Sequence, residues 1–201
     1  KTKLEKFSDQ DIDMFSTDLE QQFFRLEILV NDILDLSRIR TGQFSYSVSQ
    51  FNLSELISET LVRMEEQFKD IPGQSPEIIS TAKEIIVNWD KFRMEQVLVN
   101  LLTNAIKYGE NSPITVGISQ EHDHVIISVS DLGRGIHPEA QEMIFNRFER
   151  AGITTNEISG LGLGLYITYQ IVTYHQGKIW VDSVLGQGST FYVKIPQYPD
   201  F

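Results

Sequence analysis

The chain of 201 residues contains no cysteine, which excludes both a disulfide framework and a cysteine-based zinc site. It also lacks an apolar run of about 18 residues and a signal-peptide pattern, so neither a membrane span nor a secretory leader is predicted. Lys and Arg number 17 against 28 Asp and Glu, and the net charge of −11 argues against broad contact with nucleic acid. We expect a cytoplasmic chain; segments that anchor a parent protein in a membrane would lie outside this sequence.

A long helix is predicted at the start of the chain, from about Ser8 to Arg40. Its apolar residues recur alternately every three and four positions, which is typical of a helix that another helix covers. This seam consists of Ile12, Phe15, Leu19, Leu26, Leu29, Ile33 and Leu36. Phe23, Val30 and Leu34 widen the apolar face, which favours a four-helix bundle and a homodimer.

After this helix, strand and helix patterns alternate and predict an α/β protein. We expect strands at about 42–52, 77–81, 85–88, 114–120, 124–131, 178–184 and 189–195, and helices at about 53–68, 90–108, 138–146 and 161–175. This order predicts a two-layer sandwich, in which one mixed β-sheet carries helices on one face. Residues 1–41 then form one unit, the long helix, and residues 42–201 form the α/β domain.

The predicted helix 90–108 carries polar groups along one face. Asn100, Asn104 and Lys107 are spaced by four and three residues, so their side chains lie side by side. Amide oxygens can bind Mg²⁺ in a shell completed by phosphates and water, and a lysine one turn on can pair with phosphate oxygens. Tyr108 either lines the same site or caps its helix. A surface helix with solvated amides is the alternative interpretation.

A first glycine-bearing stretch, from Asp131 to Ile136, directly follows a predicted strand. A carboxylate only accepts hydrogen bonds, so Asp131 would select an exocyclic amine such as adenine N6. Gly133 and Gly135 would let the backbone approach a purine and adopt conformations that other residues avoid. An ordinary Asp-x-Gly turn has the same local sequence, and only the context favours the purine site.

A second stretch places three alternating glycines before the predicted helix 161–175. Backbone N–H groups at a helix N-terminus favour anionic phosphate. The candidate phosphate-binding residues are Gly160, Leu161, Gly162, Leu163 and Gly164. The dinucleotide-binding fingerprint is excluded, because no strand leads directly into this stretch and no suitable βαβ unit follows.

Residues between the two glycine stretches supply further candidates. Arg147 and Arg150 border a polar segment and would reach a γ-phosphate if that segment closes as a lid; solvated surface arginines are the alternative. Phe145 and Phe148 anchor the base of this lid, and either core packing or ligand contact would explain them. Thr190 is a candidate for backing an adenine pocket through water.

These stretches resemble the N, G1, F and G2 boxes of sensor histidine kinases of two-component systems, in the same order. The resemblance covers the chain from about Phe51 to its end and implies binding of ATP and Mg²⁺. The family transfers the γ-phosphoryl group of ATP to a histidine on a dimerisation helix, and then to an aspartate on a response-regulator receiver domain. Residues 8–41 are similar to the second helix of the family's dimerisation hairpin. We expect catalytic roles for Asn100, Lys107 and Arg150.

The chain departs from this family in its histidines. The phosphoacceptor histidine of the family precedes an acidic residue on the first helix of the hairpin. None of the four histidines of this chain has that setting: His122, His124, His137 and His175. We therefore expect a piece of a longer protein that binds ATP but does not phosphorylate itself at the usual site.

Two other functions share the same ATP-binding fold. Gyrase-type topoisomerases, mismatch-repair proteins and heat-shock chaperones carry a glutamate base in the equivalent helix. That place is occupied here by Asn100, which cannot take a proton, so hydrolysis is expected to be slow. A nucleotide-binding module without transfer activity is the second alternative, and the presence of all four boxes argues against it.

Overall fold

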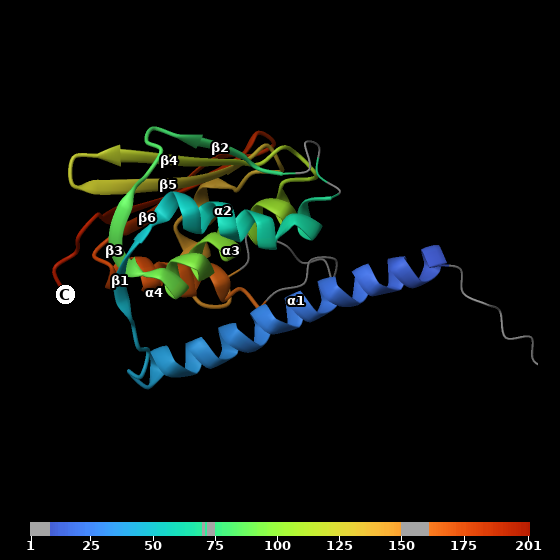
Figure 1. The fold of residues 1–201 in the computed structure, drawn as a ribbon, viewed down its shortest axis with the longest axis horizontal. Helices are drawn as coiled ribbons and strands as arrows, with labels where there is room; N and C mark the ends of the chain where they lie inside the picture. Colours follow the sequence, from blue (N-terminus) through green and yellow to red (C-terminus); the bar gives the residue numbers. More distant parts are fainter. Residues whose placement is uncertain (1–8, 70, 72–74, 150–160) are drawn as a thin grey trace, which may run out of the picture.

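The computed structural model describes residues 9–69, 71, 75–149 and 161–201. Its helices are α1 (Asp9–Arg40), α2 (Leu53–Arg63), α3 (Lys91–Tyr108) and α4 (Gly164–Tyr174), with 3₁₀ turns η1 (Glu65–Phe68), η2 (Pro138–Ala140) and η3 (Met143–Phe145). Its strands are β1 (Val48–Asn52), β2 (Glu77–Ser80), β3 (Ile86–Asp90), β4 (Thr115–Glu121), β5 (His124–Asp131), β6 (Lys178–Val184) and β7 (Gly188–Pro196). Figure 1 shows α2, α3 and α4 on one face of the sheet and α1 beneath those helices.

The five-stranded sheet has the order β2-β4-β5-β7-β6. Strands β2 and β4 are parallel, whereas the other neighbours are antiparallel, so the sheet is mixed. Along β5 every second side chain is buried, because alternate residues face the helix layer. The predicted two-layer architecture is confirmed. One detail differs: β1 and β3 pair with each other in a separate two-stranded sheet.

His175, at the end of α4, joins α4 to β3 inside the molecule. Its ring is fully buried; Nε2 accepts the Asp90 backbone N–H at 3.0 Å, and Nδ1 donates to the Ile171 carbonyl oxygen at 2.8 Å. Burial lowers the pKa of His175, which favours the neutral ring that these two bonds require. His175 therefore has a structural role, which links α4 to β3.

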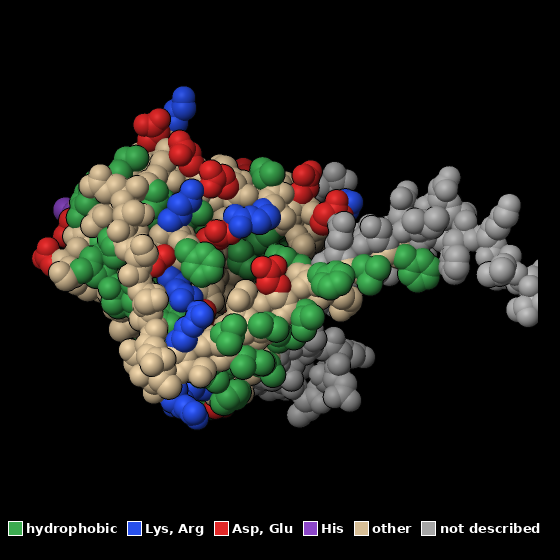
Figure 2. All heavy atoms as spheres, turned by 60° about the horizontal axis from the view of Figure 1, so that its bottom comes forward, with side chains coloured by type: hydrophobic (Ala, Val, Ile, Leu, Met, Phe, Trp, Pro, Cys, Tyr) green, Lys and Arg blue, Asp and Glu red, His purple; other side chains and the backbone are tan. Residues whose placement is uncertain are grey.

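Among the side chains of helix α1 that the structure describes, those on one side pack against the core and many others are exposed. Phe24, Leu36 and Ile39 are partly buried against the core. Figure 2 shows hydrophobic side chains gathered along α1, and these exposed residues include Phe15, Leu19, Phe23, Leu26, Val30, Ile33 and Leu34. Within the described part of the chain, no helix is both long and apolar enough to span a membrane.

Four predicted elements differ from the structure. The helix predicted at 53–68 ends at Arg63 and is followed by the 3₁₀ turn η1. Residues 42–47 are not strand, because the alternating aromatic rings there pack against helices instead: Phe44 lies 4.0 Å from the Arg93 guanidinium, and Tyr46 stacks on Tyr174. The predicted helix 138–146 consists of the two 3₁₀ turns η2 and η3. Helix α4 begins at Gly164 rather than Leu161, because Gly162 has a left-handed φ of +68°.

Candidate functional site

One cavity of about 320 Å³ collects most of the residues predicted from the sequence. It lies between the C-terminal half of α3, the turn after β5, the start of α4 and helix α1. From the α/β domain, its wall includes Asn100, Asn104, Lys107, Tyr108, Asp131, Gly135, Ile136, Leu161, Gly162, Leu163 and Gly164. Three segments predicted to act together, helix α3 and the two glycine stretches, therefore meet at one place.

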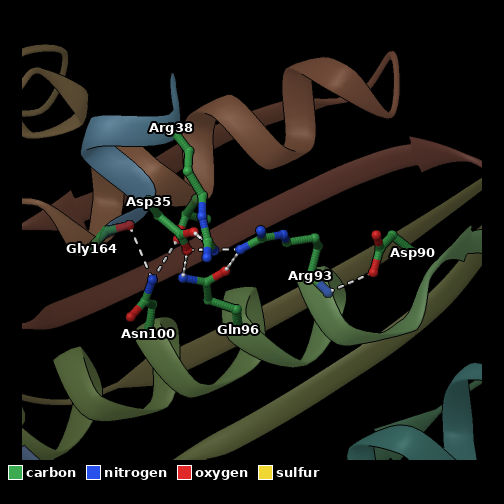
Figure 3. A network of polar contacts seen from close by, with 8 residues as sticks. Asp35, Arg38, Asp90, Arg93, Gln96, Asn100 and Gly164 are labelled. Atoms are coloured by element: carbon green, nitrogen blue, oxygen red, sulfur yellow. Dashed lines mark hydrogen bonds and ion pairs between the residues drawn. The ribbon is translucent and has the colours of Figure 1, made fainter. Parts of the chain in front are cut away.

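Asn100 is held in a fixed orientation by helix α4. Its Nδ2 atom donates to the Gly164 carbonyl oxygen at 3.2 Å and to Thr168 Oγ1 at 3.3 Å, and the side chain points from α3 toward α4 (Figure 3). Because the amide nitrogen makes these bonds, the amide oxygen is left to accept from, or to ligate, another group. Asn104 lines the cavity one turn further along α3.

The side-chain oxygen atoms at this site suit a hard cation such as Mg²⁺ only if a bound ligand supplies further oxygen atoms. Among the described residues, no group of three or more His, Cys, Asp or Glu side chains could hold a metal ion. The amide oxygens of Asn100 and Asn104 supply two oxygen ligands, and Mg²⁺ prefers six, often several from water and phosphate. The residues present therefore fit a metal ion that arrives with a phosphate group.

Asp131 is the last residue of β5 and is buried. Its Oδ1 atom accepts the Gly133 backbone N–H at 2.9 Å. Burial raises the pKa of Asp131, while hydrogen bonds from the Gly133 and Ser189 backbones lower it. Oδ1 thus has a protein donor, and the carboxylate keeps capacity to accept a further donor from the cavity.

The glycines after Asp131 are needed by packing between backbones. A Cβ atom on Gly133 would lie 2.1 Å from the Tyr108 carbonyl oxygen, at the end of α3. Gly135 has φ +68°, as expected for a position that other residues avoid, and a Cβ atom there would lie 2.1 Å from the Val184 carbonyl oxygen. The close approaches found here are to protein, whereas the sequence suggested an approach to a purine.

The N-terminus of α4 opens toward the cavity. The N-cap residue, Leu163, makes no side-chain capping hydrogen bond, and Gly162 to Leu165 all line the cavity. The first N–H groups of a helix have no partner within the helix, so they suit an anion. Lys107 lines the same cavity, which places a cationic group in reach of that anion.

The structure does not place four of the predicted residues in the cavity wall. Gly133 packs beneath it; Arg147 lies over the Tyr166 ring at 5.5 Å; Phe148 is 63% exposed. Thr190 faces the opposite side of the sheet, where its Oγ1 lies 2.8 Å from Ser130 Oγ. Because side chains alternate along a strand, Ser189 lines the cavity instead.

The remaining expectations concern the predicted lid and its base. Phe145 packs edge-to-face on Phe191 with ring centroids 6.5 Å apart, so its role is core packing. Arg150 and Gly160 lie outside the described residues.

Several wall residues were not predicted. Arg134 belongs to the first glycine stretch, and its guanidinium lies 4.9 Å from the Tyr108 ring centroid, so its place in the motif was a usable signal. Gln67 and Thr103 also line the cavity, and Gln67 Oε1 and Thr103 Oγ1 are buried without a hydrogen-bond partner among the described residues. A polar ligand would satisfy such atoms.

Helix α1 supplies the last part of the wall, through Phe24, Ile28, Leu29 and Asp32. Asp32 is only 6% exposed. Burial and the neighbouring Asp35 raise the pKa of Asp32 to about 6, although Lys107 opposes this rise. No sequence signal indicated this wall, because a heptad pattern says which residues of a helix are apolar and not which surface they meet.

Comparisons with known proteins agree with this geometry. The family described as histidine kinase-, DNA gyrase B-, and HSP90-like ATPase matches residues 89–199. The circadian input-output histidine kinase CikA of Synechococcus elongatus is 37% identical over 84% of the chain and 23% of its own length. The chain spans less than half the length of this and other curated sensor kinases that it matches.

Two solved structures resemble the chain over almost its full length. Full-length ShkA in complex with AMPPNP has a TM-score of 0.74 and 25% identity, covering 98% of this chain and 41% of that one. Histidine kinase ThkA in complex with response regulator TrrA has a TM-score of 0.68 and 29% identity, covering 97% of this chain and 54% of that one. Both likenesses extend over helix α1 as well as the α/β domain.

Proposed function

Because the chain belongs to the family of histidine kinase-, DNA gyrase B-, and HSP90-like ATPases, we propose that it is the ATP-binding catalytic part of a two-component sensor histidine kinase. The relatives named above are sensor histidine kinases, and AMPPNP, an ATP analogue, is bound by one structural neighbour. The observation that carries the proposal is the meeting of Asp131, the asparagine face of α3 and the open start of α4 around one cavity. Each of these three parts suits a different portion of ATP.

In this proposal, Asp131 accepts the N6 amine of adenine through the carboxylate oxygen that Gly133 does not occupy. Lys107 and the N-terminus of α4 bind phosphate oxygens. Asn100 and Asn104 would hold Mg²⁺, which supplies charge neutralisation of the triphosphate when it is bound. Arg150, Gly160 and the lid that they border stay predictions.

The acceptor of the phosphoryl group is proposed to be a histidine rather than water. Asn100 cannot act as a base, so water would not be activated, whereas imidazole is itself a good nucleophile. The exposed apolar face of α1 suits a partner helix that carries such a histidine, and it would bring two copies of the protein together. Residues 1–41 then belong to the dimerisation unit and 42–201 to the catalytic domain.

A response-regulator receiver domain is the proposed second partner. ThkA, a structural neighbour over 97% of this chain, was solved in complex with response regulator TrrA. A receiver-domain aspartate would take the phosphoryl group from the phosphohistidine.

The test is a transfer assay with γ-labelled ATP and Mg²⁺. The chain is mixed with a separately prepared dimerisation helix pair that carries an acceptor histidine. We expect label on that histidine, and none when the histidine is replaced by alanine. Labelling should persist in the control variant Asp182→Asn, which changes an exposed carboxylate on β6. Rapid phosphate release without labelled histidine would instead favour a plain ATPase.

A further inference from the structure

Helix α1 and the α/β domain form opposite walls of the cavity, and the two walls differ in charge. Three carboxylates line the cavity within the described residues, namely Asp32, Asp131 and Glu149, against two cationic side chains, Lys107 and Arg134. Among the described residues that α1 contributes to the wall, Asp32 is the one that carries a charge. A triphosphate entering this cavity would therefore meet an added negative charge from α1.

Asp32 is buried opposite the cationic group proposed to bind phosphate. Its electrostatic interaction with Lys107 opposes the effect of burial on its ionisation, so the two groups attract each other. Lys107 belongs to α3 and Asp32 to α1, and both line the cavity. A carboxylate in that place neutralises part of the charge that Lys107 would otherwise offer to a phosphate.

A contact one turn away fixes α1 in this position. Asp35 follows Asp32 by three residues and so lies on the same face of α1. Its Oδ2 atom accepts from Arg93 Nη1 at 2.7 Å and from Gln96 Nε2 at 2.8 Å (Figure 3). Both carboxylate and guanidinium are buried, with 4% and 6% of their side chains exposed.

Arg93 is held by several contacts besides the one with Asp35. Arg93 Nη1 also donates to Gln96 Oε1 at 2.9 Å, and its backbone N–H donates to Asp90 Oδ1 at 3.0 Å. The Phe44 ring covers the guanidinium at 4.0 Å. Asp35 is thus bound by side chains of α3 that other contacts also hold in place, and this contact keeps Asp32 in the cavity wall.

We propose that Asp32 is a specificity-determining residue of the nucleotide site. When Asp35 docks on Arg93, Asp32 weakens the binding of nucleotides that carry phosphate groups. ATP in turn favours the undocking of α1. This inference rests on the proposed ATP site and adds that the site distinguishes nucleotides with phosphate groups from uncharged nucleosides. By linkage, a ligand that binds more tightly when α1 is undocked must shift α1 toward the undocked position. Adenosine carries no phosphate and so is indifferent to Asp32.

The first test compares ATP with adenosine by calorimetry at constant Mg²⁺. Asp32→Asn keeps the shape of the side chain and removes its charge, so ATP should bind roughly three- to tenfold more tightly, while adenosine affinity stays within about twofold. Asp182→Asn, the matched control on β6, should change neither. An unchanged ratio of ATP to adenosine affinity in Asp32→Asn would overturn the inference. If the unmodified chain binds neither ligand, the proposed function itself has failed.

The second test measures the position of α1 directly. The chain has no cysteine, so Gln22→Cys on α1 and Val62→Cys on α2, both exposed, take two spin labels cleanly. Pulsed dipolar spectroscopy should show a new population of longer distances when ATP is added, and not when adenosine is added. Asp35→Asn should produce that population without any nucleotide. A distance distribution that saturating ATP leaves unchanged would contradict the proposal.

Discussion

The two sides of the cavity are built in different ways. On the side of the α/β domain, Asp131 ends a central strand, and Gly133 and Gly135 pack so closely on neighbouring backbones that a methyl group would not fit. On the side of α1, the helix is held by the ion pair between Asp35 and Arg93, while much of its apolar surface is exposed. Its buried Asp32 makes the wall less favourable to anions.

The two sides therefore suit different roles: the domain side suits recognition of the nucleotide, and the α1 side suits regulation of the cavity. The domain side cannot move without disturbing the sheet and α3, so it suits selection of the base and the metal. The α1 side depends on the hydrogen bonds that Asp35 accepts from Arg93 and Gln96 and on partial apolar packing, so a few kcal/mol decide its position. A ligand or a partner helix that meets α1 can therefore change the cavity without altering the domain.

The largest effect is expected where the domain side is most tightly packed. Gly135→Ala should lower the free energy of unfolding by about 2–5 kcal/mol, since it adds left-handed strain to an overlap with the Val184 carbonyl oxygen. Urea denaturation measures this loss. Gly186→Ala is the matched control: φ is +76°, but a Cβ atom there meets nothing within 4 Å. Equal losses in the two variants would show that packing at Gly135 contributes nothing.

On the α1 side of the cavity, the buried carboxylate of Asp32 should make the stability of the chain depend on pH. The pKa of Asp32 rises from 3.8 to about 6 on folding, so the folded chain binds more protons between these values. Its stabilising contribution is complete below pH 3.8 and is lost as pH rises through about 6. Asp32→Asn should therefore be more stable than the unmodified chain at pH 7.5, by at most about 3 kcal/mol, and equally stable near pH 4.

The difference in the free energy of unfolding between Asp32→Asn and the unmodified chain does not contain the contributions that the two chains share. His175 works in the opposite direction, because its lowered pKa makes its contribution present at high pH and lost as pH falls, and it is the same in both chains. Chemical denaturation at several pH values provides the comparison. A difference that does not depend on pH would mean that Asp32 is not buried in solution.

A smaller effect is expected on ATP affinity when the residue proposed to recognise adenine is changed. Asp131→Asn replaces an acceptor by an amide whose nitrogen would face the adenine amine, because Gly133 keeps the oxygen as its acceptor. ATP binding should weaken by roughly 1–3 kcal/mol, the usual consequence of leaving a buried polar group unpaired. Titration calorimetry against the Asp182→Asn control measures it. Unchanged affinity for ATP would refute the adenine assignment.

Much of the domain could be predicted from the sequence, because its signals are local. The strand predicted at 124–131 has the bounds of β5, and the helix predicted to begin at Asp90 is α3, for which Asp90 is the N-cap residue. The strand predicted at 42–52 was wrong over 42–47, since alternation there reflects rings that pack on α3 and α4. Thr190 was placed on the site because the motif did not reveal which face of β7 it occupies.

The part of the cavity built by α1 could not be predicted. The contact between Asp35 and Arg93 joins residues 58 positions apart, and no local pattern links them. Nor did periodicity distinguish Asp32 from a surface carboxylate, because burial depends on the surface that the helix meets. Arg134 is a different case: it lay inside a recognised stretch, and its position between two glycines was evidence enough to include it.

The central claim is that one cavity binds an adenine nucleotide with Asp131 at the base and Asn100 and Asn104 at the metal. A crystal structure of the chain with Mg²⁺ and a non-hydrolysable ATP analogue tests it most directly. The account predicts the exocyclic amine within hydrogen-bond distance of the Asp131 carboxylate and Mg²⁺ bound by the two amide oxygens. A nucleotide bound elsewhere, or a base that does not meet Asp131, would contradict it.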